Sequence, residues 1–145
     1  MVLSDVLLHP SEYDDAAVMA PWTPLLGDEF ELLHTTIFGS LFLVDRLGRV
    51  FLLDSWSGQL LGVSVDFESY KASVAGAPEF FRSWFMTDLA ELLAANGVNR
   101  MAGQVYAPLV SPALGGSLEV RNFSLAPARA YVATSAAEVL ALPRR

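Results

Sequence analysis

The chain has 145 residues, of which 53% are hydrophobic and 17% charged, so its length and composition predict one folded domain and not a disordered segment. Polar and turn residues interrupt every hydrophobic run before the roughly 20 residues that a membrane-spanning helix needs. The net charge is −7 and cysteine is absent, which excludes disulfides, cysteine nucleophiles and thiolate metal sites. Because the first residues also lack the basic stretch of a secretory signal peptide, we expect a cytoplasmic protein.

The first third of the chain predicts one short helix followed by a strand. Pro10 and the acids after it indicate a helix from Ser11 to Ala20, with Glu12, Asp14 and Asp15 in its first turn, since acidic side chains favour the positive end of the helix dipole. The sequence Pro21-Trp22-Thr23-Pro24 should end this helix. The Thr, Ile and Phe content of residues 31–38 is typical of a strand.

The centre of the chain predicts an antiparallel β-meander. Two apolar runs, Leu41–Val44 and Val50–Leu53, flank a tight connection in which we expect Gly48 to adopt a positive φ. A second turn ends at Gly58 and leads to a fourth strand, Gln59–Val65. Because the apolar residues of the central strands are consecutive and do not alternate, both faces of these strands should be covered.

Two helical segments are predicted next. Asp66 should cap a helix that stops at Gly76. Pro78 should open a second segment, whose aromatic and leucine residues recur at helical spacing as far as Asn96-Gly97. Thr87-Asp88 offers a point at which this segment can divide into two helices.

The C-terminal part is less regular. Residues 106–116 are rich in Pro and Gly and are expected to form an ordered loop, and residues 118–125 a strand. Residues 129–133 fit a strand or a helix, whereas Ser135–Glu138 has capping-box spacing and predicts a helix over 136–142. Helices and strands are segregated along the chain, which indicates a single α+β domain over residues 1–145, with a meander of about four to five strands packed against helices.

The sequence has no recognisable catalytic or metal-binding motif. Its two histidines, His9 and His34, do not stand at metal-ligand spacing, and a P-loop, a dinucleotide fingerprint and a nucleophile elbow are all absent. We interpret His34 as a hydrogen-bonded strand residue and His9 as exposed. Asp45 and Asp54, at strand ends, should accept hydrogen bonds from turn amides. We therefore expect no enzyme, cofactor or metal; an enzyme using His34 with either aspartate is the least favoured alternative.

The negative charge is concentrated in the first third. Residues 1–45 contain eight acids and no Lys or Arg, whereas residues 46–145 have a net charge of +1. This asymmetry disfavours direct binding of nucleic acid, which requires a basic surface, and favours a basic protein partner. The candidate partner-binding residues are Asp14, Asp15, Asp28, Glu29 and Glu31. The alternative is that these acids serve only to keep an apolar protein soluble.

An ordered series of residues extends over most of the chain. It consists of Trp22, Gly39, Phe42, Asp45, Gly48, Leu53, Asp54, Gly58, Tyr106, Pro112, Leu114, Gly115, Gly116 and Asn122. In order and spacing the series resembles the C-terminal domain of bacterial type VI secretion DNase-immunity proteins, which follows a GAD-like domain. The resemblance covers about residues 22–142. This chain differs in having Ala136-Ala137 where the family often has Gly-Gln, in lacking a histidine near the last helix, and in being too short for a GAD-like domain, so we expect a stand-alone version.

The resemblance implies a cytoplasmic protein that binds and neutralises a secreted bacterial toxin, with a nuclease as the favoured class, and that has neither catalytic residue nor cofactor. The residues of the series are then expected to be structural. The alternative function is a small-ligand-binding or regulatory module, in which the loop over 106–116 borders a pocket with Tyr106, Trp56 and Trp84 as apolar walls.

Overall fold

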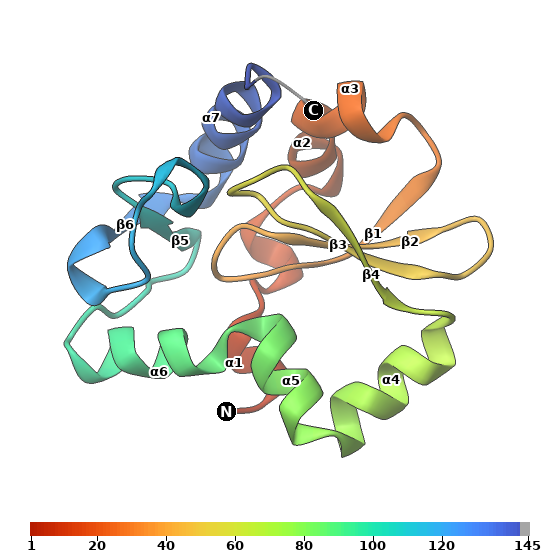
Figure 1. Cartoon of the computed structure of the whole chain (residues 1–145), viewed down its shortest axis with the longest axis horizontal. Helices are drawn as coiled ribbons and strands as arrows, with labels where there is room; N and C mark the ends of the chain where they lie inside the picture. The colour runs from red at the N-terminus through yellow and green to blue at the C-terminus, as the bar shows by residue number, and fades with distance from the viewer. Residues whose placement is uncertain (143–145) are drawn as a thin grey trace.

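A computed structural model describes residues 1–142 of the chain. It contains a four-stranded antiparallel sheet, a separate two-stranded sheet and helices that pack on both (Figure 1), which confirms the predicted α+β class. Among the described residues, each helix is too short or too polar to span a bilayer.

The bounds of the elements are as follows. The helices are α1 (Leu3–Val6), α2 (Asp15–Met19), α3 (Thr23–Leu26), α4 (Phe67–Gly76), α5 (Pro78–Phe85), α6 (Thr87–Ala95) and α7 (Ala128–Leu140). Short 3₁₀ helices are η1 (Pro10–Glu12), η2 (Ala20–Trp22), η3 (Pro112–Leu114) and η4 (Val120–Asn122). The strands are β1 (Phe30–Thr35), β2 (Leu41–Asp45), β3 (Val50–Leu53), β4 (Leu60–Ser64), β5 (Gln104–Pro108) and β6 (Phe123–Pro127).

The larger sheet is the predicted meander, with strand order β1-β2-β3-β4. Leu41, Phe42 and Leu43 of β2 are all completely buried, so both faces of this strand are covered as expected. Successive side chains point to opposite faces. Leu41 and Leu43 therefore pack with Trp22 against α2 and α7, whereas Phe42 packs on the opposite face with Tyr70 of α4. In Figure 1, α4 and α5 lie on one side of the sheet and α2 and α3 on the other.

The smaller sheet consists of β5 and β6, which lie beside α7 (Figure 1). It is joined to the meander by the backbone N–H of Tyr106, which donates to the carbonyl of Ile37 at 2.8 Å. The Tyr106 hydroxyl donates to the carbonyl of Val98 at 2.7 Å, and its ring packs against Phe38. A third core cluster thus lies between the two sheets and α6.

The predicted helix over 11–20 is wrong in its extent. Glu12 belongs to the separate turn η1, and α2 starts at Asp15, after Asp14, whose carboxylate accepts the backbone N–H of Ala17 at 3.1 Å. The segment Pro21-Trp22-Thr23-Pro24 does not end the helical region either, since η2 and α3 follow α2 directly. Both prolines stand in first turns, where an N–H has no helical partner, and the path ends only at Gly27.

The predicted middle helices are confirmed, with Asp66 as the cap of α4. The division between α5 and α6 falls at Met86, whose φ is 55°, one residue before the expected break. The expected loop over 106–116 is wrong at its start because β5 includes Tyr106. The expected strand over 118–125 begins only at Phe123, after η4. Residues 129–133 are helical, and α7 extends from Ala128 to Leu140 without interruption.

Candidate functional site

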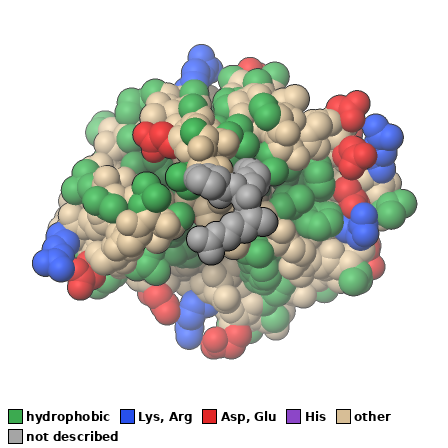
Figure 2. Space-filling view, turned by 45° about the horizontal axis from the view of Figure 1, so that its top comes forward, with side chains coloured by type: hydrophobic (Ala, Val, Ile, Leu, Met, Phe, Trp, Pro, Cys, Tyr) green, Lys and Arg blue, Asp and Glu red, His purple; other side chains and the backbone are tan. Residues whose placement is uncertain are grey.

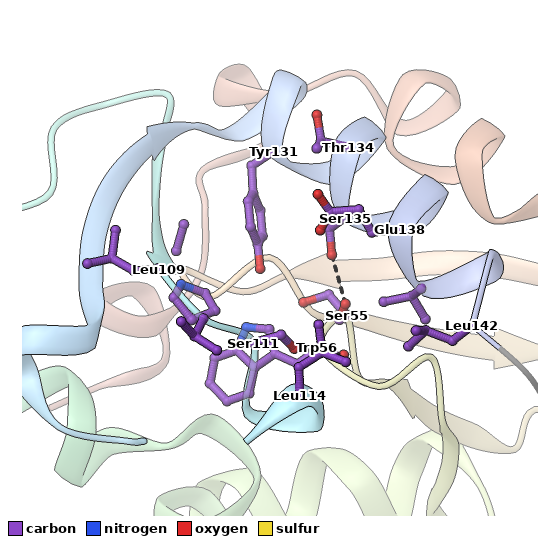
Figure 3. Close-up of a pocket in the computed structure, with 14 residues that line it drawn as sticks. Ser55, Trp56, Leu109, Ser111, Leu114, Tyr131, Thr134, Ser135, Glu138 and Leu142 are labelled. Carbon is purple, nitrogen blue, oxygen red and sulfur yellow. Dashed lines mark hydrogen bonds between the residues drawn. The ribbon is translucent and has the colours of Figure 1, made fainter. Parts of the chain in front are cut away.

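A cavity of about 390 Å³ opens between α7, the loop that follows β5, and the turn between β3 and β4 (Figure 3). Ser55 and Trp56 line it from the turn, Tyr131 and Ser135 from α7, and residues 107–111 and Leu114 from the loop and the end of β5. Its volume is in the usual range of ligand pockets, about 300–1,000 Å³. The cavity is therefore large enough to hold a ligand or a side chain of a partner.

The loop is fixed by Asn122, which is buried. The Asn122 amide nitrogen donates to the carbonyls of Val110 and Ser117 at 2.9 and 2.8 Å, and its amide oxygen accepts the N–H of Val110 at 3.0 Å. Gly116 lies so close that a Cβ there would come within 1.8 Å of the Val110 carbonyl oxygen. In addition, the Ser111 hydroxyl donates to the carbonyl of Trp56 at 3.1 Å. This wall of the cavity is thus preformed.

The turn that holds Trp56 is organised by Asp54. The Asp54 carboxylate accepts the N–H of Trp56 and the hydroxyl of Ser57, both at 2.9 Å, and Gly58 closes the turn with a φ of 74°. The expectation that Asp54 accepts a turn amide is thereby confirmed. Trp56 is 8% exposed and packs edge-on against Phe38, and its indole N–H is buried without a hydrogen-bond partner among the described residues.

Tyr131 forms the opposite wall, and in Figure 3 its hydroxyl points toward Trp56. Its ring rests on the backbone of Gly39, where a Cβ would come within 2.7 Å of the Tyr131 Cε1 atom. Burial is the largest influence on Tyr131 and raises the pKa of its phenol, although contacts with Ser135, Ser55 and Trp56 oppose this. The phenol is therefore protonated at neutral pH. The Ser135 hydroxyl donates to the carbonyl of Ser55 at 2.8 Å and joins α7 to the turn.

Among residues 1–142, the charged groups that line the cavity or act on its side chains are acidic. Glu138 lines it, and the Asp54 carboxylate is close enough to raise the pKa of Tyr131. Within residues 1–142, no Lys or Arg is among the lining residues. The site thus combines apolar walls, a buried N–H donor, a phenol and acidic surroundings, a set that can bind a neutral or cationic group and disfavours an anion.

The histidines do not belong to this site. His34 lies in β1 opposite Phe42 and packs against the rings of Phe42 and Tyr70, and burial lowers the pKa of its imidazole. Asp45 is opposite Phe30 at the end of the same pair of strands; it accepts the N–H groups of Leu47 and Arg49, as expected of a turn aspartate. His9 is exposed, as expected, and caps η1. In the described part of the chain, no group of three or more potential ligands is placed to hold a metal ion.

The five candidate acids are all exposed, and they are divided among α2, the turn before β1, and β1 itself. Asp14 and Asp15 are at the start of α2, and Asp14 is occupied as its cap. Asp28 and Glu29 form the turn before β1, and Glu31 is in β1; because Phe30 is opposite Asp45, these three lie at the end of the sheet remote from Ser55 and the cavity.

Basic residues from later in the sequence reach acids of the first third in space. Arg46, in the β2–β3 turn, approaches Asp28 at 3.9 Å, and both side chains are highly exposed. The Glu12 carboxylate, which is largely buried, binds Arg100 at 2.8 Å. On the face in Figure 2, acidic and basic side chains lie next to each other around the edges. The acidic first third of the sequence is therefore not a uniformly acidic surface.

Most residues of the series, from Trp22 to Asn122, occupy positions at which the backbone conformation or burial restricts the residue type. Gly39, Gly48, Gly58 and Gly115 have positive φ angles of 81°, 79°, 74° and 93°, which confirms the expectation for Gly48. Most of the bulky members are buried: Trp22, Phe42, Leu53 and Tyr106. Pro112 opens η3. The exception is Leu114, which is 63% exposed at the rim of the cavity.

Of the three aromatic walls expected for a pocket in the alternative function, Trp56 lines this cavity. Tyr106 is a core residue, and Trp84 lines a second cavity of about 320 Å³ with Trp56. Tyr131 and Ser135 were not predicted as site residues. Nothing local distinguishes them in the sequence, because their role depends on the contact of α7 with Gly39 and Ser55.

No protein-family model and no curated protein sequence matches the chain. Among solved structures, the chain is similar to the crystal structure of Atu4351 from Agrobacterium tumefaciens, with a TM-score of 0.57 and 17% sequence identity. The similarity covers 90% of this chain, which spans 65% of the length of that chain. At this level of identity the comparison establishes a shared fold alone.

Proposed function

We propose that the chain is a non-enzymatic immunity protein, which binds and neutralises a secreted bacterial toxin in the cytoplasm, and that the toxin is a nuclease. The observation that supports this most is the arrangement of the series in the fold: Gly116 and Asn122 together hold the loop at Val110, and Gly39 supports Tyr131 on the opposite wall of the same cavity. A pattern whose members depend on each other sterically is a better family signature than shared composition, and the family that the pattern resembles neutralises toxins.

Charge supports the choice of a basic partner. The net charge is −7, and the contact of Asp28 with Arg46 is long and exposed, so it contributes little and leaves the carboxylate available. A nuclease presents a basic groove to its substrate, and negative side chains such as Glu29 and Glu31 would speed and orient its association with this chain. Neutralisation would follow from covering the groove or the active site of the toxin.

The proposal is tested by co-expression with each toxin encoded beside the gene for this chain. Growth of the host should be restored by this chain but not by an empty vector, and a catalytically inactive toxin should purify with it as a one-to-one complex. Failure of every neighbouring toxin to be neutralised would refute the proposal. Reversal of Asp28, Glu29 and Glu31 to Lys should slow association and weaken its dependence on salt.

A second candidate function, a small-ligand-binding module, is favoured by the cavity itself. Trp56 lines it together with residues 107–111 and Leu114 of the expected loop, although Tyr106 and Trp84 do not. A metabolite that raises the melting temperature of the wild-type chain, but not that of a Thr134→Trp variant with a bulky ring at the edge of the cavity, would support this function. A metabolite screen without stabilisation would count against it.

A further inference from the structure

We propose that the cavity between α7 and the loop over 109–114 is the docking site of the toxin, and that it receives a large apolar side chain from a toxin segment that also carries Lys or Arg. This inference rests on the proposed function and adds to it the surface of contact, which lies away from the acids at the start of β1.

The rim of the cavity identifies the occupant as a protein. Three apolar residues of one loop are exposed: Leu109 to 67%, Val110 to 50% and Leu114 to 63%. Exposed apolar residues are ordinary when they occur singly, but a group beside a concave site is typical of an interaction surface. A small molecule inside the cavity would leave these side chains in water, whereas a protein segment that enters the cavity would also cover the rim.

The loop over 109–114 is exposed, but its backbone is held in one conformation. Asn122 and Ser111 hold it through the hydrogen bonds described above. Because its backbone is already ordered, association does not have to fix it, and less of the binding free energy is lost. Rigid apolar groups around a pocket are the usual setting of the few residues that dominate a protein interface.

The interior of the cavity defines the chemistry of the occupant. The Trp56 indole N–H is buried, and the Tyr131 hydroxyl points toward it, close enough for Trp56 to oppose the rise in the pKa of that phenol. A large apolar side chain would fill the space that these two aromatic side chains border.

Charge around the cavity selects the residues that flank this side chain. Glu138 and the nearby Asp54 are acidic, and no basic residue of the described chain lines the site. An acidic toxin segment would be repelled, whereas Lys or Arg beside the inserted side chain would be attracted. The net charge of the chain is also negative, −7, so long-range attraction and docking favour the same partner.

The test compares Asp substitutions at exposed leucines. Leu109→Asp and Leu114→Asp place a charge at the rim, and Leu47→Asp places the same charge on a 76% exposed leucine in the β2–β3 turn. Binding of the catalytically inactive toxin to the full chain is measured by surface plasmon resonance, with melting temperatures as a check of folding. Each rim variant should bind at least about 30-fold more weakly, chiefly through faster dissociation, and Leu47→Asp should bind within about threefold of wild type.

Thr134→Trp gives a second test because it places a bulky ring at the α7 edge of the cavity and leaves Leu109 and Leu114 unchanged. It should weaken toxin binding to a similar extent. Wild-type affinity in all three cavity variants would overturn the inference while the proposed function stands. If the wild-type chain itself neutralises no toxin, the proposed function fails instead, so the two failures are distinguishable.

A measurement without toxin uses N-acetyl-L-phenylalaninamide as a probe of the cavity. This compound combines an apolar ring with amide carbonyls. It should shift the indole N–H resonance of Trp56 in a saturable manner, and the shift should disappear in Thr134→Trp. A Trp56 resonance that does not respond up to the solubility limit of the probe would contradict the assigned chemistry of the cavity.

Discussion

Replacement of Asn122 by Ala should destabilise the chain by about 2–3 kcal/mol. The substitution removes three hydrogen bonds, two donated to the carbonyls of Val110 and Ser117 and one accepted from the N–H of Val110, and each contributes about 1 kcal/mol net. Val110 is half exposed, so its freed groups reach water, which keeps the loss at or below the full sum. For a chain of this length such a change should lower the melting temperature by about 5–10 °C.

Urea unfolding, followed by tryptophan fluorescence, measures this change, with Asn99→Ala as the matched control. Asn99 is exposed and its side chain makes one long hydrogen bond, to the carbonyl of Gly97 at 3.4 Å, so its loss should cost less than about 0.5 kcal/mol. If Asn122→Ala unfolds at the same urea concentration as Asn99→Ala, Asn122 does not hold the loop and the account of a preformed cavity wall is wrong.

Three further substitutions test other parts of the structure by the same urea assay. Gly39→Ala should cost at least about 1 kcal/mol more than Gly48→Ala, because both have a positive φ but only the first Cβ meets an aromatic ring; equal costs would refute this contact. Glu12→Gln should cost about 1–2 kcal/mol near neutral pH. Burial raises the pKa of Glu12, but hydrogen bonds, chiefly that from Arg100, lower it below its usual 4.5. The stability advantage of the wild type over Glu12→Gln should therefore shrink as the pH falls below that value. A difference in stability that does not depend on pH would contradict this assignment. Trp22→Phe should cost less than about 2 kcal/mol, against about 3–5 for Trp22→Ala, since the buried indole N–H has no partner to lose; similar costs would show that the N–H is bonded.

The meander could be predicted because its information is local. Consecutive apolar residues in β2 and β3 indicated two covered faces, and the turns at Gly48 and Gly58 required the positive φ angles that glycine adopts easily. The cap of α4 was recognised in the same way, whereas the capping-box spacing of Ser135–Glu138 lies inside α7. Asp66 stands one residue before α4 and binds its first turn through the N–H of Ser69.

The C-terminal elements could not be predicted because they depend on distant contacts. β5 forms by pairing with β6, so Tyr106 joins a strand although the segment that follows it is rich in Pro and Gly. Helix α7 lacks a clear apolar face in the sequence: Val132 and Ala136 pack toward α2 and the sheet, while Tyr131 and Ser135 turn toward Gly39 and Ser55.

The candidate site shows the same division. Its supporting residues, among them Asn122 and Gly116, were found as members of the series, but the cavity that they build was not, because it joins the turn at Trp56, the loop and α7. The distribution of charge along the sequence predicted the charge of the surface only in part. Arg46 comes from outside the acidic first third and reaches Asp28 only in the folded chain.

Neutralisation of a toxin by binding can be measured by adding the purified chain to the purified neighbouring toxin and following its cleavage of plasmid DNA. Cleavage should fall linearly and stop at one equivalent of the wild-type chain, and Leu114→Asp should require a large excess. Undiminished cleavage in an excess of the folded wild-type chain, for every neighbouring toxin, would contradict the account.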